Sequence, residues 1–331
     1  MPNPLPRTTL LRALREAGGS AGSAELARQL QAAGQELSPR SVRLHLQRLE
    51  AEGFVQPARR GRGGGRAITE RGLAEIKDAA VQERIGFTAA RMDEMACRMS
   101  FNLETLAGQI VLNLTIVREP DLRAALAEMR PAMAAGLGMG HYAALFATGE
   151  TVGTQAIPPG HAGIGTLCSV TVNGLLLNAR IPTVSRFAGV LELRAGEPVR
   201  FTDLISYAGT TLDPLEIFIK SGLTRVRDAA RTGTGRIGAS FREIPTCALA
   251  EAERLFARLR ACGLGGLLKI GRPNQPLLGL PVPEGRTAIL VAGGLNPCAA
   301  FQEIGIPGIN TALSQLYDFR RLRPCRELLP G

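Results

Sequence analysis

A chain of 331 residues is too long for one ordinary domain, so we expect a small module joined to a larger one of roughly 200 residues or more. Apolar residues make up 45% and charged residues 21%, a composition that excludes a largely disordered chain. The sequence does not begin with a signal peptide and contains no apolar run of the roughly 18 residues that span a bilayer, so we expect a cytoplasmic protein. The net charge of +10 favours a polyanionic partner, and six scattered cysteines without a CxxC pair predict buried thiols, not a disulfide framework or a structural zinc site.

Three short helices are predicted in the first fifty residues. The first covers Thr8–Ala17 and ends at a glycine pair, and the second covers Ala24–Leu30 after Ser23 as its N-cap. Ser38 caps a third helix that continues to Leu49, with Pro39 at its first position, where the missing N–H costs nothing.

The third helix has one apolar face, formed by Val42, Leu46 and Leu49. The remaining positions carry side chains that can contact base edges or phosphates: Arg40, Ser41, Arg43, His45, Gln47 and Arg48. By itself this pattern also fits a solvated amphipathic helix, so its interpretation depends on the residues after Leu49.

A basic hairpin comes after the third helix. Gly53 ends the helix, a strand begins at Phe54, and a second strand, Ala67–Thr69, returns into a helix that starts near Glu70. The glycine-rich tip between the strands holds the arginines Arg59, Arg60, Arg62 and Arg66. A flexible basic loop unrelated to DNA is the alternative, but the order of helices and hairpin over residues 1–78 resembles the winged helix-turn-helix domains of bacterial and archaeal repressors, and predicts binding of double-stranded DNA.

Residues 79–106 are predicted to form a helical connector, interrupted near Gly86. The connector is expected to pair with its copy in a homodimer or dimer of dimers, because helix-turn-helix repressors commonly bind two half-sites of an inverted repeat. A linker without self-association is the alternative.

The rest of the chain contains an internal duplication. Gly108, Ile110 and Ala125 recur at a constant spacing as Gly235, Ile237 and Ala252. Each copy then reads as a strand, an amphipathic helix (Asp121–Ala135 and Thr246–Ala261) and a Gly-Leu-Gly turn. We therefore predict a multidomain α/β (α+β) protein whose effector domain, 107–331, consists of two lobes with mixed sheets, about 107–232 and 233–331, and a cleft where the lobes meet.

Two glycine-rich passages are candidates for ligand binding. Residues 163–174 read as a strand, on which the candidate ligand contacts are Thr166, Cys168, Ser169, Thr171 and Asn173. In the second passage, a strand enters Gly293 and Gly294, and Asn296 is expected to cap a helix with Pro297 in its first turn. With Arg180 and Arg186 as a carboxylate clamp, these residues predict a site for a small anion; a solvent-facing strand and a plain strand-to-helix turn are the alternatives.

The phrases "GIGTLCSVTVNGLLLNARIPTVSRFAGVLEL" and "GGLNPCAAFQEIGIPGI" resemble the regulatory domain of NrpR-type repressors of nitrogen-assimilation genes, a family that also carries an N-terminal winged helix. The resemblance covers most of residues 7–320. It implies repression by an oligomer bound to an operator and release by an intracellular metabolite, which is 2-oxoglutarate for the characterised archaeal members. Some members carry two regulatory domains, whereas a single one is visible here.

An enzyme is not expected, because no activated nucleophile or paired acid and base is apparent, and the run Gly233–Gly238 lacks the full dinucleotide fingerprint. No cofactor is expected beyond the effector. Two rival functions are a metal-responsive regulator that uses His141, His161 and Cys168, and, with less support, an enzyme fused to a DNA-binding module.

Overall fold

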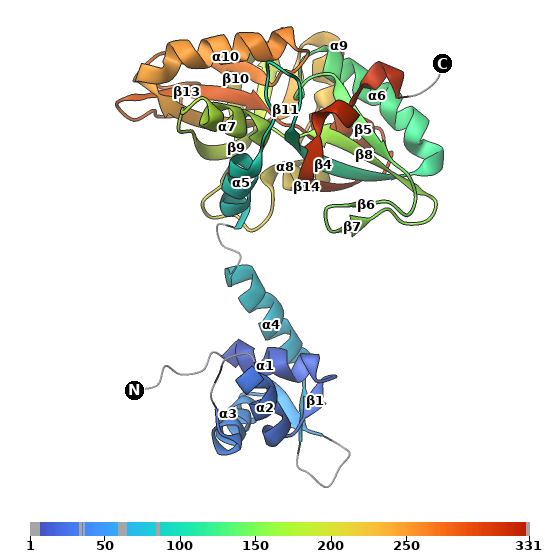
Figure 1. Cartoon of the computed structure of the whole chain (residues 1–331), viewed down its shortest axis with the longest axis vertical. Coiled ribbons are helices and arrows are strands. Elements are labelled where there is room, and N and C mark those ends of the chain that lie inside the picture. Colours follow the sequence, from blue (N-terminus) through green and yellow to red (C-terminus); the bar gives the residue numbers. More distant parts are fainter. Residues whose placement is uncertain (1–6, 33–34, 36, 59–64, 84–86, 329–331) are drawn as a thin grey trace. The chain divides into compact units, whose positions relative to one another are not determined.

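The computed structural model describes residues 7–32, 35, 37–58, 65–83 and 87–328 (Figure 1). The chain divides into two compact units, Met1–Ile85 and Gly86–Gly331. No helix of the described residues is long and apolar enough to cross a membrane.

The first unit is a winged helix. Its helices are α1 (Arg7–Glu16), α2 (Ser23–Ala32), α3 (Pro39–Ala51) and α4 (Glu70–Glu83), and its strands are β1 (Ser20–Ala21), β2 (Val55–Pro57) and β3 (Arg66–Ile68). The strands form an antiparallel sheet in the order β1-β3-β2. Apolar faces of α1, α2 and α3 supply the core through residues such as Leu11, Leu26 and Leu46, and the apolar face predicted for the third helix is confirmed.

The second unit contains two repeats of the same order of elements. The first is β4 (Gln109–Arg118), α6 (Leu122–Ala134), β5 (Tyr142–Phe146), β8 (His161–Leu167), α7 (Val170–Asn178) and β9 (Val184–Arg194). The second is β11 (Gly235–Pro245), α10 (Leu249–Ala261), β12 (Leu267–Ile270), β13 (Arg286–Ala292), α11 (Asn296–Gln302) and β14 (Ile309–Asp318). Outside the repeats lie α5 (Phe87–Arg98), β6 (Thr151–Val152), β7 (Gln155–Ala156), β10 (Glu197–Ser206), α8 (Pro214–Lys220), α9 (Val226–Thr232) and β15 (Arg323–Pro324).

The two repeats exchange their last strands. One sheet has the order β14-β4-β8-β5-β15 and the other β10-β9-β11-β13-β12, so β14 joins the sheet of the first repeat and β9 joins that of the second. The unit combines helices with two sheets, so the α/β (α+β) class is confirmed. All strand pairs described in both sheets are antiparallel, so the expected mixture of parallel and antiparallel pairs is not found. Antiparallel pairing results because β8 lies between β4 and β5, and β13 between β11 and β12, which is a split β-α-β arrangement.

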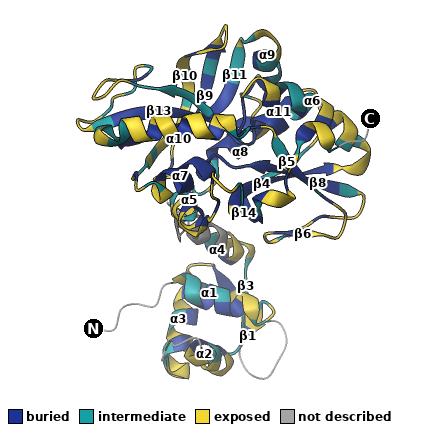
Figure 2. Ribbon diagram, turned by 45° about the horizontal axis from the view of Figure 1, so that its top comes forward, coloured by how far each residue is buried: buried dark blue, intermediate teal, exposed yellow. Residues whose placement is uncertain are grey.

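Helices cover these sheets and close a large apolar core. In Figure 2, α10 lies over its sheet with an exposed outer side, while Ala252, Leu255 and Phe256 on its inner side are buried. Strand β4 is buried continuously from Ile110 to Val117, as expected for a strand covered on both faces. The exchange of β9 and β14 therefore ties the two repeats into one core.

The passage 163–174 is only partly a strand, which corrects our prediction. Strand β8 ends at Leu167, and Val170 begins α7, a helix whose residues Val170–Leu176 are all buried. The β-branched residues of Val170–Val172 favour a strand locally, but complete burial between packed elements outweighs that preference, since propensity is worth only tenths of a kcal/mol per residue, about 0.7 at most.

Candidate functional site

Helix α3 presents a basic outer surface. The Ser38 hydroxyl accepts a hydrogen bond from Ser41 N at 3.1 Å, which confirms Ser38 as the N-cap. Val42, Leu46 and Leu49 are buried. On the other side Arg40, Arg43, Gln47 and Arg48 are exposed, while Ser41 and His45 are half-buried.

The three arginines of this surface make no ion pair with any described residue. By contrast, Arg7 in the same unit pairs with Glu52 and Glu75. A helix surface with three uncompensated guanidinium groups is suited to a polyanion, because each can contact a phosphate without first breaking an internal pair.

The described part of the wing is held to α3 by an ion pair. Arg66 on β3 pairs with Glu50 near the end of α3, with its Nη2 atom 2.7 Å and its Nε atom 2.8 Å from Glu50 Oε2. This pair fixes the base of the hairpin to α3, so Arg66 braces the wing. Arg59, Arg60 and Arg62 lie outside the described residues.

In the second unit the two glycine-rich passages meet. A Cβ atom at Gly294 would lie 2.1 Å from the carbonyl oxygen of Leu167 and 3.0 Å from the Cα of Cys168, so only glycine allows this approach. Gly293 N donates to Gly238 O at 2.8 Å. The backbone segments that end β8 and β13 are thus packed directly against each other where the repeats join.

Asn296 has a structural role at this junction, which corrects its assignment as a helix cap. It is the first residue of α11, with Leu295 in the cap position, and its side chain is fully buried. Its Oδ1 atom accepts from Gly238 N at 2.9 Å, and its Nδ2 atom donates to Gly238 O at 2.8 Å and to Leu137 O at 2.7 Å. The amide is fully used in holding β11 and the turn after α6, so it is not available to a ligand.

A buried arginine that the sequence analysis did not single out lies beside the junction. Arg242 on β11 is completely buried and donates through Nη1 to Ser169 O at 2.9 Å, through Nη2 to Ser169 Oγ at 2.8 Å and through Nε to Ser240 Oγ at 3.0 Å. It also donates to Asn173 Oδ1. An arginine inside a strand of mostly small and apolar residues, Ile237–Ile244, is the sequence signal that would have found it.

All four acceptors of Arg242 are uncharged, and no carboxylate among the described residues lies within ion-pair distance of it. Burial lowers the pKa of this guanidinium, which nevertheless stays protonated. The charge also lies at the N-terminus of α7, the positive end of the helix dipole. An anion placed here would neutralise both.

A small cavity of about 10 Å³, the size of one water molecule, adjoins this cluster. Cys168, Ser169, Tyr207, Asp213 and Gly294 are among the residues that line it. Burial raises the pKa of the Cys168 thiol to about 12 and that of the Asp213 carboxyl to about 6, and it raises the pKa of Tyr207 as well. These groups are therefore largely removed from solvent, and the cavity beside them leaves room for about one water molecule.

The other predicted contacts are distributed around this centre. The buried Thr166 hydroxyl lies beside the Cys298 thiol, and the Thr171 hydroxyl is buried without a partner among the described residues. Arg180 follows the C-terminal end of α7, about 12 Å along the helix from Val170 at 1.5 Å per residue, so it cannot clamp an anion at Ser169. Arg186 on β9 pairs with Glu243 at 3.5 Å. Arg180 is therefore too far away for the predicted clamp at Ser169, whereas the predicted role of Arg186 stays a prediction.

The residues proposed for the metal-binding alternative do not come together in the structure. His161 is the first residue of β8, and Cys168 directly follows its last residue. At about 3.3 Å per residue the two are about 20 Å apart. The His161 ring contacts Pro159 O. No group of three potential metal-ligating side chains occurs among the described residues. His141 lines a separate cavity, formed in part by the end of α6 and the start of β5.

Comparisons with known proteins agree with this architecture. Residues 85–324 match the family model of NrpR regulatory domains NRD1 and 2, and residues 8–76 match that of the Ribonuclease R winged-helix domain. A nitrogen repressor-like protein from Methanococcus jannaschii has a similar fold, with a TM-score of 0.60 and 24% identity over 71% of this chain and 97% of that one.

Two curated relatives align along almost the whole chain. The global nitrogen regulator NrpRI of Methanosarcina mazei is 33% identical over 95% of this chain and 96% of its own length. The global nitrogen regulator NrpR of Methanococcus maripaludis is 28% identical over 93% of this chain but only 53% of its own length, so this chain spans about half of that relative. These matches identify a regulator and not an enzyme, and the chain belongs to the NrpR family of global nitrogen regulators.

Proposed function

We propose that this protein is a cytoplasmic transcriptional repressor that binds operator DNA through α3 and the wing, and that a small anionic metabolite controls this binding. The leading candidate for the metabolite is 2-oxoglutarate, and the leading candidates for the target are nitrogen-assimilation genes. The names of its relatives support a role in nitrogen regulation.

The exposed, unpaired arginines of α3 are the observation that carries the DNA-binding part. Each phosphate contact that is lost should reduce the slope of log affinity against log salt concentration by about one unit. Arg43→Ala and the double variant Arg60→Ala/Arg62→Ala should therefore weaken operator binding, as measured by fluorescence anisotropy at several salt concentrations. Arg15→Ala, on the exposed part of α1, is the matched control. An unchanged affinity and salt slope in both variants would refute the assignment.

The repressor is proposed to act as a homodimer or dimer of dimers on an inverted repeat. Two recognition helices related by a two-fold axis would then contact half-sites about 34 Å apart, or a multiple of that distance. Sedimentation of the protein alone and on operator DNA tests this: a monomer in both states contradicts it.

The effector part rests on the uncompensated charge of Arg242 at the N-terminus of α7. A buried cation without an anion is costly, and a carboxylate entering between the Cys168–Val170 and Gly293–Leu295 segments would accept from the guanidinium and from the helix N–H groups. Because the cavity here holds only about one water molecule, binding requires the two repeats to move apart. That movement is how ligand binding would alter the winged-helix unit's affinity for its operator.

Titration of the whole protein with 2-oxoglutarate tests this part. We expect a rise in melting temperature and a change in operator affinity; a tenfold change in affinity requires about 1.4 kcal/mol of coupling. Arg242→Gln should lose the response, whereas Arg194→Ala should keep it, since Arg194 is exposed and pairs with Glu192. The absence of binding heat with 2-oxoglutarate and other dicarboxylates would exclude an anion sensor of this kind.

A further inference from the structure

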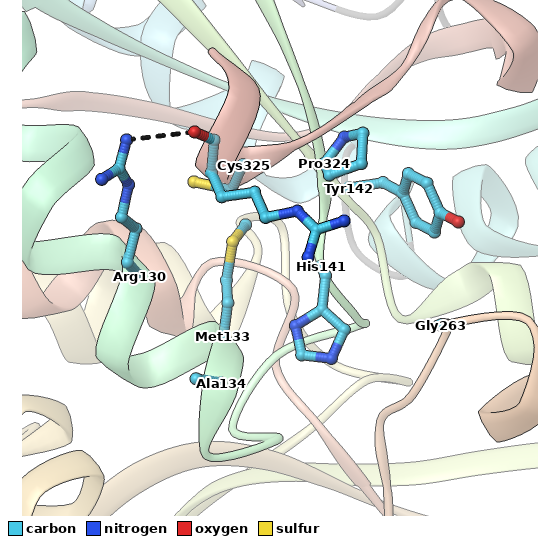
Figure 3. A pocket seen from close by; sticks show the side chains of 9 residues that line it. Arg130, Met133, Ala134, His141, Tyr142, Gly263, Pro324 and Cys325 are labelled. Carbon is cyan, nitrogen blue, oxygen red and sulfur yellow. Dashed lines mark hydrogen bonds between the residues drawn. The ribbon is translucent and has the colours of Figure 1, made fainter. Parts of the chain in front are cut away.

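A second and larger cavity, of about 390 Å³, lies elsewhere in the regulatory unit (Figure 3). Its walls come from the end of α6, the start of β5, the turn after α10, and the segment formed by β15 and the following helical turn, Cys325–Glu327. The lining residues are Arg130, Met133, Ala134, His141, Tyr142, Gly263, Pro324, Cys325 and Arg326. A volume of this size is within the range of small-molecule sites, roughly 300–1,000 Å³.

Backbone hydrogen bonds hold these walls together. His141 N donates to Gly263 O at 3.2 Å, and Cys325 N donates to His141 O at 2.8 Å. The Tyr142 hydroxyl donates to Cys262 O at 3.3 Å. The cavity is therefore built from both repeats and the C-terminal segment, and backbone contacts maintain its walls.

The residues that line the cavity include basic side chains, although Arg326 Nε lies 3.5 Å from Glu327 Oε1, next to the lining. Arg130, Arg326 and His141 line it, and no aspartate or glutamate among the described residues does. Arg130 Nη2 donates to Arg326 O at 3.4 Å, as the dashed line in Figure 3 shows, while Arg130 Nε is buried and has no acceptor among the described residues. A buried N–H without an acceptor is costly, and the side-chain neighbour of this guanidinium is the Cys325 thiol, a weak acceptor, so an anionic oxygen near Arg130 would be favourable.

The rest of the lining is apolar. Met133, Ala134 and Pro324, together with the ring of Tyr142, form most of the wall. A fully hydrated inorganic anion would leave this surface without a partner, whereas a ligand with an apolar part would cover it.

The corresponding place in the second repeat differs. Between α10 and β12 there is a hollow of about 380 Å³, but Glu253 lines it together with Arg260 and Lys269. In addition, β12 is an edge strand, whereas β5 is covered by β15. The basic lining without a carboxylate is thus a property of the first repeat and not an inevitable result of the duplication.

We propose that this cavity is a second ligand site, which takes a small organic carboxylate with an apolar body. The carboxylate accepts from Arg130, and the apolar part lies against Met133 and Pro324. The site is separate from the Arg242 junction, so its occupancy does not depend on the proposed repressor function.

The test is calorimetric titration of the wild-type protein with 3-phenylpropionate. Two control ligands are titrated in the same way: 3-phenyl-1-propanol, which is uncharged and of nearly the same shape, and inorganic phosphate, which is an anion without an apolar part. We expect saturable binding of the acid, and binding of the alcohol and of phosphate weaker by about tenfold or more. Equal binding of acid and alcohol, or no saturable binding of the acid, overturns the proposal.

Variants locate the binding. Arg130→Met keeps the length and apolar character of the side chain and should weaken 3-phenylpropionate binding about tenfold or more, whereas Arg123→Met, on the exposed side of the same helix, should not. Because the chain has no tryptophan, Tyr142→Trp introduces a single fluorophore into the wall, and its emission should change on binding. Unchanged affinity in Arg130→Met overturns the assignment. Probe binding is measured without DNA or 2-oxoglutarate, so a failure here is distinguishable from a failure of the repressor proposal.

Discussion

Arg242 and Ser169 are joined by two hydrogen bonds, one to the carbonyl oxygen at 2.9 Å and one to the hydroxyl at 2.8 Å. The bonds connect β11 of the second repeat to the start of α7 in the first, across 73 positions of the chain. They place an unpaired positive charge where the two repeats meet. The stability of the regulatory unit and its proposed ligand response therefore depend on the same contact.

Replacement of this arginine by an apolar side chain should be strongly destabilising. Arg242→Met leaves the buried acceptors of Ser169 and Asn173 without donors, at about 1–3 kcal/mol for each unsatisfied group. We expect a lower midpoint in urea denaturation followed by circular dichroism. Arg194→Ala, which removes an exposed arginine whose partner Glu192 still pairs with Arg200, should shift the midpoint far less. Equal midpoints for wild type and Arg242→Met would contradict a structural role.

The close approach of Gly294 to Leu167 predicts intolerance to a methyl group. Gly294→Ala places a Cβ against a backbone oxygen that cannot rotate away, and overpacking of this kind costs about 1–3 kcal/mol or more. Gly209→Ala is the matched control, since nothing lies within 4 Å of a Cβ there. Thermal melts of both variants check this, and a control as unstable as Gly294→Ala would argue against a specific clash.

Two partly buried carboxyl groups should make the free energy of unfolding fall as the pH rises. Burial raises the pKa of Asp213 to about 6 and that of Glu216 to about 7. The folded protein then retains protons that the unfolded chain releases, so the free energy of unfolding decreases between about pH 4 and pH 7. Asp213→Asn keeps the cap of α8, where Asp213 Oδ1 accepts from Leu215 N at 2.9 Å, and removes one of these titrations.

The measurement is the difference in free energy of unfolding between this variant and wild type across that pH range. The variant should gain stability relative to wild type as the pH rises. A difference that does not vary with pH would show that Asp213 titrates alike in the folded and unfolded chains.

The N-cap of α3 offers a test within the winged-helix unit. Ser38→Ala removes the acceptor for Ser41 N and should cost about 1 kcal/mol, whereas Ser38→Asp should restore most of the stability because aspartate is an equally good cap. Operator affinity should fall in parallel with the order of α3. If Ser38→Asp is no more stable than Ser38→Ala, the cap does not determine the start of this helix.

The sequence by itself determined the features that depend on local patterns. Ser38, Pro39 and the spacing of Val42, Leu46 and Leu49 suffice to define α3, because capping and helical periodicity involve residues a few positions apart. The duplication was visible for the same reason, as a repeated order of strand, helix and glycine turn, and the quoted phrases placed the chain in its family.

Tertiary structure decided the rest. The exchange of β9 and β14 depends on pairing between distant strands, which leaves no local signature. The segment Val170–Asn178 becomes a helix because its residues Val170–Leu176 are all buried, against the β-branched composition of its first three residues. Arg242 takes the place predicted for Arg180 at Ser169 because the surroundings of a charge, which lie far apart in sequence, determine which arginine is left without a carboxylate.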